Sequence, residues 1–258
     1  MDLGLRGRTA LVCSSTAGLG RATAEALGAE GVRVVISGRR RELAEQIAAA
    51  LPGAEAVPCD VTEKGAAVEL ADAAKRAMGA ELDIVVLNGP GPKPATASEI
   101  DADDVRAAVE TLLVFHQELV AAVLPGMRER GWGRILAIGS GGVAEPIPSL
   151  ALSNIGRAAL AGYLKSLATE VAGDGVTVNM LLPGRMDTDR VRSLDATAAE
   201  RQQRDVAEVA AAAAASIPAR RYGTPEEFGA VAAFLCSQQA GYVTGTATRC
   251  DGGAVHHL

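Results

Sequence analysis

Aromatic side chains and paired cysteines are scarce in this sequence. Aromatic residues make up 3% of the 258 residues, although apolar residues make up 48% and alanine dominates them. This composition favours tightly packed helices on a sheet of Val, Ile and Leu, and it argues against an all-β core. No two cysteines form a C-x-x-C pair, so we expect reduced thiols and no metal site at Cys13, Cys59, Cys236 and Cys250.

A concentration of one charge sign and a long apolar run are also missing. The net charge of −6 is spread along the chain, without a basic stripe that would collect the phosphates of a nucleic acid. The first seven residues contain no apolar signal-peptide core, and no run approaches the ~20 apolar residues that a membrane span needs. We therefore expect a cytoplasmic protein without nucleic-acid or membrane partners.

Short apolar runs of strand length alternate with helical patterns along the chain. A run at 9–13, a helical pattern at about 21–30 and a second run at 32–36 predict a right-handed βαβ unit. Further strands are expected near 56–57, 84–87, 134–138, 176–182 and 246–250, with long helices near 103–130, where Pro125 can introduce a kink, and 152–172. Near-continuous apolar strands indicate a parallel seven-stranded sheet with helices on both faces, hence one doubly wound Rossmann-type α/β domain over 1–258.

The segment 189–219 breaks this alternation, because it is polar at first and then rich in alanine. We expect one or two helices there. An insertion after the carboxyl end of a strand lies where open sheets bind ligands, so this segment can form a lid over a substrate. Packing against a neighbouring subunit is the alternative.

A small-residue loop follows the first strand. Gly18 and Gly20 in the run Ser14-Ser15-Thr16-Ala17-Gly18-Leu19-Gly20 allow a pyrophosphate to approach the backbone at a helix N-terminus. The second strand ends before Arg39, where an acidic residue would instead hold the ribose of NAD. Because an arginine suits a 2′-phosphate, NADP(H) is favoured over NAD(H). A solvated helix start at 39–41 is the alternative.

Further motifs follow the glycine loop along the chain: Cys59-Asp60-Val61-Thr62, Asn88-Gly89-Pro90-Gly91, Pro183-Gly184 followed by Thr188, and the C-terminal segments 221–227, 242–245 and 251–253. Together with the loop they resemble the short-chain dehydrogenase/reductase family, most closely its 3-oxoacyl carrier-protein reductase-like branch. The resemblance implies that Asp60 binds adenine, that Asn88 and Gly89 flank a ribose, and that Thr188 holds the nicotinamide carboxamide. The resulting cofactor-binding set is Ser14, Ser15, Thr16, Gly18, Leu19, Gly20, Arg39, Asp60, Val61, Asn88, Gly89, Arg157, Pro183, Gly184 and Thr188.

The same resemblance exposes an atypical active site. Family members use Asn, Ser and a Tyr-x-x-x-Lys pair; here Ser140 matches the serine, whereas Ser153 and Arg157 stand at the Tyr and Lys positions and Thr111 at the Asn position. Ser153 and Arg157 are four residues apart on one predicted helix and face the same site. An alkyl hydroxyl is a much weaker acid than a phenol of pKa ~10, and arginine stays charged because its pKa exceeds ~12, so it cannot relay a proton.

Other ionisable residues offer no evident substitute. Tyr163 lies ten residues beyond Ser153, about 15 Å along the helix, and His116 is expected at a subunit interface. Three functions remain open: reduction of an activated ketone with Ser140, Ser153 and Arg157 as the oxyanion site and water as the proton source, non-redox catalysis such as elimination, isomerisation or ring formation, and nucleotide sensing without turnover.

Partners and substrate are less clearly encoded. The two long helices carry extended Ala, Leu and Val faces that resemble the family's four-helix interfaces, so we expect a homotetramer or homodimer. The substrate pocket is expected between 92–97, 141–147, Arg185 and 189–219. Arg185 hints at an anionic or polar small-molecule substrate, although a surface salt bridge is the alternative.

Overall fold

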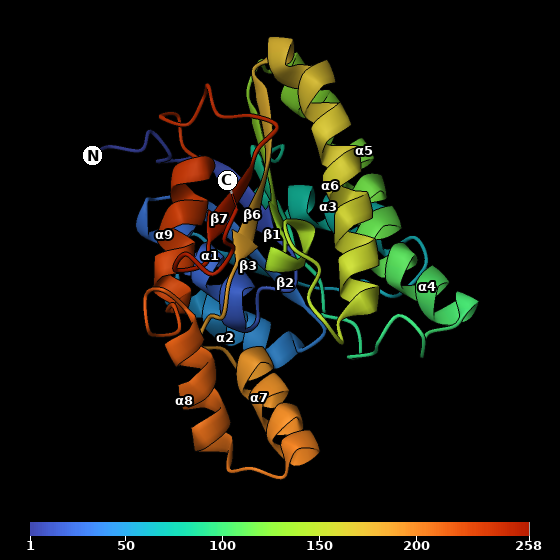
Figure 1. Cartoon of the computed structure of the whole chain (residues 1–258). Helices are drawn as coiled ribbons and strands as arrows, with labels where there is room; N and C mark the ends of the chain where they lie inside the picture. The colour runs from blue at the N-terminus through green and yellow to red at the C-terminus, as the bar shows by residue number, and fades with distance from the viewer. Residues whose placement is uncertain (258) are drawn as a thin grey trace.

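Seven parallel strands form the central sheet of the protein, which a computed structural model describes over residues 1–257 (Figure 1). The strand order is β3-β2-β1-β4-β5-β6-β7, and every neighbouring pair is parallel. This arrangement confirms the predicted Rossmann-type α/β fold. The strands are β1 (Thr9–Val12), β2 (Arg33–Gly38), β3 (Glu55–Pro58), β4 (Ile84–Leu87), β5 (Gly133–Ile138), β6 (Val176–Pro183) and β7 (Ala247–Cys250).

The central strands are largely apolar because both faces of the sheet are covered. In β1, Leu11 belongs to one buried core, whereas its neighbours Ala10 and Val12 belong to the other. The same alternation divides Ile84 from Val85 in β4. Successive side chains of a strand point to opposite faces, so a sheet between two helical layers needs an apolar residue at nearly every position.

Two layers of helices enclose the sheet (Figure 1). Apolar residues of α1 (Gly18–Ala29), α2 (Arg41–Ala50) and α9 (Pro225–Leu235) fill the core on one face. The core on the other face is filled from α3 (Ala66–Met78), α5 (Phe115–Glu129) and α6 (Ala151–Val171). The chain crosses between the layers at the β1–β4 junction, where the strand order reverses and leaves a crevice at the carboxyl ends of the strands.

The long helix expected at 103–130 is divided into three parts. It consists of α4 (Ala102–Val109), a π-helical turn at Glu110–Val114 and α5, and Pro125 lies inside α5. The departure from α geometry therefore falls at the π turn and not at the proline. The combined run Ala102–Glu129 is long and apolar enough to cross a membrane, but its buried side packs into the core, and core helices of soluble proteins pass the same test.

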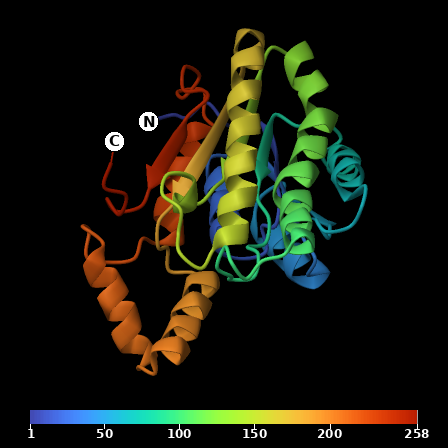
Figure 2. The ribbon, with the colours of Figure 1, turned by 45° about the vertical axis from the view of Figure 1, so that its right-hand side comes forward.

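The insertion at 189–219 contains two helices, α7 (Asp189–Gln202) and α8 (Val206–Ser216). They form a hairpin that extends from the carboxyl end of β6, away from the body of the domain (Figure 2). Thr188 caps α7 by accepting a hydrogen bond from Val191 N, and Asp205 caps α8 in the same way from Ala207 N. The hairpin thus stands beside the crevice, where the sequence predicts a lid.

Substitution of two phenylalanines of α9 tests the placement of the core. Phe228 is fully buried, whereas Phe234 is 39% exposed. We expect Phe228→Ala to lower the free energy of unfolding by about 3–5 kcal/mol, because it removes a packed ring and leaves a cavity. Phe234→Ala should cost about 1–2 kcal/mol, because less apolar area leaves the core. Urea denaturation of both variants measures the difference, and equal losses would contradict this packing.

Candidate functional site

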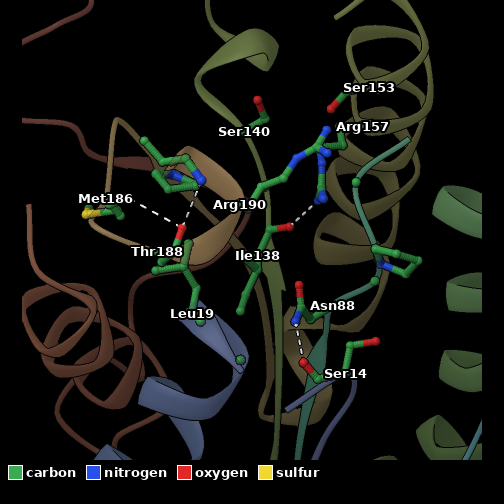
Figure 3. Close-up of a pocket in the computed structure, with 18 of the residues that line it drawn as sticks. Ser14, Leu19, Asn88, Ile138, Ser140, Ser153, Arg157, Met186, Thr188 and Arg190 are labelled. Atoms are coloured by element: carbon green, nitrogen blue, oxygen red, sulfur yellow. Dashed lines mark hydrogen bonds between the residues drawn. The ribbon is translucent and has the colours of Figure 1, made fainter. Parts of the chain in front are cut away.

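A cavity of about 1050 Å³ opens at the crevice in the sheet (Figure 3). Residues that follow the carboxyl ends of four neighbouring strands line it: Ser14 after β1, Asn88 after β4, Ser140 after β5 and Gly184 after β6. Its wall also includes residues of the α7–α8 hairpin and of the segment after β7, namely Asp189, Arg190, Val191, Leu194, Ser216, Asp251, Ala254 and Val255.

The loop after β1 is held against β4 by close backbone contacts. Asn88 Nδ2 donates a hydrogen bond of 3.2 Å to Ser14 O. A Cβ atom at Gly20 would lie 2.6 Å from each of these two atoms, so only glycine fits there. Ser14 itself has a φ of +47°, a left-handed conformation that glycine adopts more easily than serine. The turn predicted for this loop is thus formed, although with some backbone strain at Ser14.

The N-terminus of α1 faces the cavity without a side-chain cap. Ala17 occupies the N-cap position and makes no side-chain hydrogen bond, and Gly18, Leu19 and Gly20 line the cavity as predicted. The first backbone N–H groups of a helix have no partner within it, and together with the helix dipole they favour an anion.

Ser15 does not belong to the anion-binding surface, contrary to the prediction. Its hydroxyl is fully buried, donates 2.7 Å to Val12 O and accepts 2.9 Å from Ser37 N. These bonds join β1 to β2, so no hydroxyl is left for a ligand. Thr16 does line the cavity, and its Oγ1 accepts a hydrogen bond of 3.0 Å from Arg40 Nη2.

Arg39 and Arg40 stand at one end of the cavity, next to Asp60. Arg39 Nη1 lies 4.0 Å from Asp60 Oδ2, at the limit of an ion pair. Asp60 and Val61 line the cavity, and hydrogen bonds from the Thr62 hydroxyl and backbone lower the pKa of the Asp60 carboxyl. The prediction for this end named Arg39 and omitted Arg40 from the binding set, although the side chain of Arg40 is fixed by Thr16 and lines the same space.

Ser140, Ser153 and Arg157 line the same part of the cavity (Figure 3). Ser140 Oγ accepts a hydrogen bond of 3.1 Å from Gly142 N, which leaves its own proton free for a ligand. Ser153 and Arg157 lie on α6 and are only 9% and 7% exposed. Arg157 Nη1 donates 2.5 Å to Ile138 O, the last carbonyl of β5.

Arg157 is charged although it is buried. Burial, followed by the nearby positive charge of Arg190, lowers the pKa of its guanidinium to about 10. The group therefore remains protonated at neutral pH. Arg157 can polarise a bound oxygen but cannot take up or release a proton in the neutral range.

Thr111 and His116 do not reach the cavity. Thr111 Oγ1 donates 3.0 Å to Ala107 O of its own helix, and Thr111 is absent from the cavity lining, so the predicted catalytic role is not supported. His116 was expected at a subunit interface but is 1% exposed within this chain, near Gly89. Burial, followed by the charge of Arg157, lowers the pKa of His116 to about 3, so its imidazole is neutral.

The outer wall differs from the prediction in its arginines. Arg185 donates 2.5 Å to Asp195, a side chain that is 2% exposed, so this carboxylate compensates its charge. Arg185 still lines the cavity, and so does Arg190 in the first turn of α7, which was not named as a site residue. The sequence signal for Arg190 was its position two residues after Thr188, because these two residues then lie at the same end of one helix. Of the other predicted segments, 92–97 does not line the cavity, whereas Gly141 and residues 145–147 of 141–147 do, together with Pro148 and Leu150.

Comparison with known proteins places the chain in a family. A family model described as enoyl-(acyl carrier protein) reductase matches residues 13–255. The 3-oxoacyl-[acyl-carrier-protein] reductase FabG of Haemophilus influenzae is 32% identical, over 96% of this chain and 98% of its own length. Dehydrogenase/reductase SDR family member 4 of Bos taurus is also 32% identical, over 98% and 89%. The chain is a short-chain dehydrogenase/reductase.

Solved structures of other short-chain dehydrogenases/reductases have the same fold. The L-sorbose reductase of Gluconobacter frateurii, solved with NADPH and L-sorbose, has a TM-score of 0.92 and 28% identity, with 100% of both chains covered. YwfH, an NADPH-dependent reductase involved in bacilysin biosynthesis, has a TM-score of 0.90 and 27% identity, over 97% of this chain and 99% of its own. The family assignment therefore rests on sequence and on structure over nearly the whole length.

The bonds of Asp195 are expected to hold α7 of this short-chain dehydrogenase/reductase beside the cavity. Asp195 accepts from Arg185 Nη1 and, at 2.9 Å, from the Tyr222 hydroxyl. Asp195→Ala removes both acceptors, and we expect amide hydrogen exchange in 189–202 to accelerate on the order of 10–100-fold. Asp187→Ala, which removes only an exposed pair with Arg192, is the control. Equal exchange in both variants would show that this network does not anchor α7.

Proposed function

We propose that this short-chain dehydrogenase/reductase reduces the carbonyl group of a small molecule with NADPH, using Ser140, Ser153 and Arg157 in place of a tyrosine–lysine pair. One observation carries the proposal. The three side chains line a single cavity together with the uncapped N-terminus of α1 and the glycine loop. A site for a dinucleotide and a site for an oxyanion therefore adjoin each other.

The residues of the cavity fit a dinucleotide. The free N–H groups at 18–20 suit a pyrophosphate, and the missing Cβ at Gly20 lets the loop pack against Asn88. By family resemblance, Asp60 and Val61 would contact the adenine, Asn88 and Gly89 a ribose, and Thr188, next to Pro183 and Gly184, the carboxamide; all seven line the cavity. When bound, NADPH would supply the hydride.

Preference for NADP(H) over NAD(H) is supported by the charge at the end of β2. Arg39 and Arg40 line the cavity there, and their fork-shaped guanidinium groups suit a 2′-phosphate. Asp60 is the nearest carboxylate to Arg39, and it is also engaged by Thr62. The L-sorbose reductase solved with NADPH and the NADPH-dependent reductase YwfH agree with this choice.

The protein groups would stabilise the developing alkoxide and would not protonate it. The free hydroxyl proton of Ser140, the hydroxyl of Ser153 and the positive charge of Arg157 can all approach an oxygen placed between them. Hydride would add to the carbonyl carbon, and the oxygen would then take a proton from water. Because neither serine is a strong acid, we expect turnover to be slow and to require an activated carbonyl.

We also propose that the protein is a cytoplasmic homotetramer or homodimer acting on a small molecule, with no nucleic-acid or membrane partner. The outward sides of α5 and α6 carry small and apolar residues, including Ala121, Pro125, Ile155, Ala158 and Gly162. Such faces let helices of two subunits approach closely. The same association would cover the apolar part of the run Ala102–Glu129 that this chain leaves unburied.

Charge reversal at the end of β2 tests the cofactor preference. Arg39→Glu combined with Arg40→Glu should raise the Kd for NADPH on the order of 10–100-fold, because charge-assisted bonds to a 2′-phosphate are lost, and should leave that for NADH nearly unchanged. Fluorescence titration of both nucleotides measures the two constants. Arg41→Glu is the matched control, because Arg41 pairs with Glu45 and lies outside the cavity lining. A similar loss for NADH would contradict a 2′-phosphate site.

Reintroduction of an acid tests the proposed reaction. The unmodified protein should oxidise NADPH slowly in the presence of a reactive diketone. Ser153→Tyr combined with Arg157→Lys should increase this rate on the order of 10²–10⁴-fold, because a positioned general acid is restored. Absorbance at the reduced-nicotinamide band reports both rates.

Three outcomes of this experiment separate the candidate functions. Oxidation that increases in the double variant supports the proposal. Tight NADPH binding without oxidation by either protein, over a broad panel of carbonyl compounds, would favour non-redox catalysis or nucleotide sensing. No increase in a double variant that folds and binds NADPH would contradict the placement of Ser140, Ser153 and Arg157 around the reacting carbonyl.

A further inference from the structure

Two arginines from different elements converge inside the cavity. Arg157 extends from α6 and Arg190 from the first turn of α7, and their guanidinium groups point toward one another (Figure 3). Arg190 is held in this position by a hydrogen bond of 2.8 Å from its Nη2 to Pro92 O and by contact with Gly91, where a Cβ would lie 3.2 Å from the guanidinium. Their mutual repulsion adds to the lowering of the Arg157 pKa.

Neither guanidinium has a carboxylate within 4 Å in the part of the chain that the structure describes, residues 1–257. Four acidic residues line the cavity. Asp189 pairs with Arg192, Asp60 lies near Arg39, Asp251 accepts hydrogen bonds from the backbone of 253 and 255, and Glu145 forms no ion pair with either arginine. The neighbouring His116 is neutral. A cation that is more than nine-tenths buried beside a second cation is unfavourable unless an anion joins them.

We propose that Arg157 and Arg190 together bind a carboxylate of the substrate, which makes the substrate an oxo acid. Within residues 1–257, the Arg157 guanidinium makes one hydrogen bond, to Ile138 O, so its remaining N–H groups are free to face the cavity. Guanidinium groups bind carboxylates through paired hydrogen bonds. Two of them from opposite walls can hold one carboxylate between them.

The position of Ser153 fixes the distance between the acid group and the reacting carbonyl. Ser153 lies one helical turn before Arg157 on the same side of α6, and Ser140 lies on the adjoining strand end. A carbonyl oxygen at the two serines and a carboxylate at the two arginines are therefore near neighbours. This part of the inference rests on the proposed reductase and points to a 2-oxo or 3-oxo acid.

A matched pair of ligands separates the contribution of the carboxylate charge to binding from the contribution of molecular shape. Acetoacetate and methyl acetoacetate carry the same ketone, but only the first has a carboxylate. Calorimetric titration of the chloride-free protein, with and without NADP⁺, gives binding without any turnover, and NADPH oxidation gives kcat/KM for each compound. The variants are Arg190→Gln, Arg190→Lys and, as control, Arg192→Gln, which alters an exposed arginine of α7 outside the cavity lining.

We expect acetoacetate to bind and to be preferred over its ester. Arg190→Gln should reduce the preference for the acid at least about 10-fold, Arg190→Lys should retain part of it, and Arg192→Gln should leave it unchanged. Equal binding of acid and ester to the unmodified protein would overturn the inference. So would loss of acetoacetate binding on addition of NADP⁺ together with weaker NADP⁺ binding in Arg190→Gln, because the arginines would then hold a cofactor phosphate.

The two proposals can fail separately. Acetoacetate binding that depends on Arg190 without any NADPH oxidation would retain the carboxylate site and reject the reductase. NADPH oxidation with equal kcat/KM for acid and ester would retain the reductase and reject the carboxylate site.

Discussion

The hydrogen bond from Arg157 to the carbonyl of Ile138 is the constraint on which the rest of the site depends. It joins α6 to the end of β5 and keeps a positive charge at the crevice. On the other side of α6, the preceding Gly156 permits close packing against the π-helical turn, because a Cβ there would lie 2.7 Å from Leu112 Cδ1. Close helix packing and a buried charge are therefore parts of one arrangement.

Local charge in the cavity differs from the charge of the whole chain. The protein has a net charge of −6, yet three groups in the cavity favour anions. These are the uncapped start of α1, Arg39 with Arg40 at one end, and Arg157 with Arg190 at the other. Low-dielectric walls concentrate the field of such groups. The net charge of the chain therefore does not predict the charge of the ligand. The charge of the ligand depends on the few charged side chains of the cavity whose partners of opposite charge lie elsewhere or are missing.

The sequence predicted those features that follow from local rules. Because helices cover both faces of the sheet, the apolar pattern of the sequence was enough to predict the strands and helices. The four-residue spacing placed Ser153 and Arg157 on one side of α6. Side-chain direction at Ser15 and His116 depends on which neighbouring element packs there, and no spacing encodes it. The π-helical turn changes the orientation of residues such as Thr111, which a regular helix would have placed differently.

Likewise, the sequence could not say which arginine of the outer wall is free. Arg185 and Arg190 are equally plausible from composition, and the difference arises because Asp195, ten residues after Arg185, folds back onto it from α7. Arg185, whose charge Asp195 compensates, then supports the cavity wall, whereas Arg190 has no such carboxylate and faces the cavity. A contact of this kind exists only once the helix has docked.

The cavity wall contributed by Ala254 and Val255 follows β7, the last strand along the chain. A polypeptide leaves the ribosome from its N-terminus, so the glycine loop and the centre of the sheet are synthesised long before this wall. Before β7 is available, β6 has no partner on that side and the cavity lacks the wall formed by Ala254 and Val255. The complete cavity can bind a ligand only after β7 has paired with β6 and the segment that follows β7 has folded over the cavity.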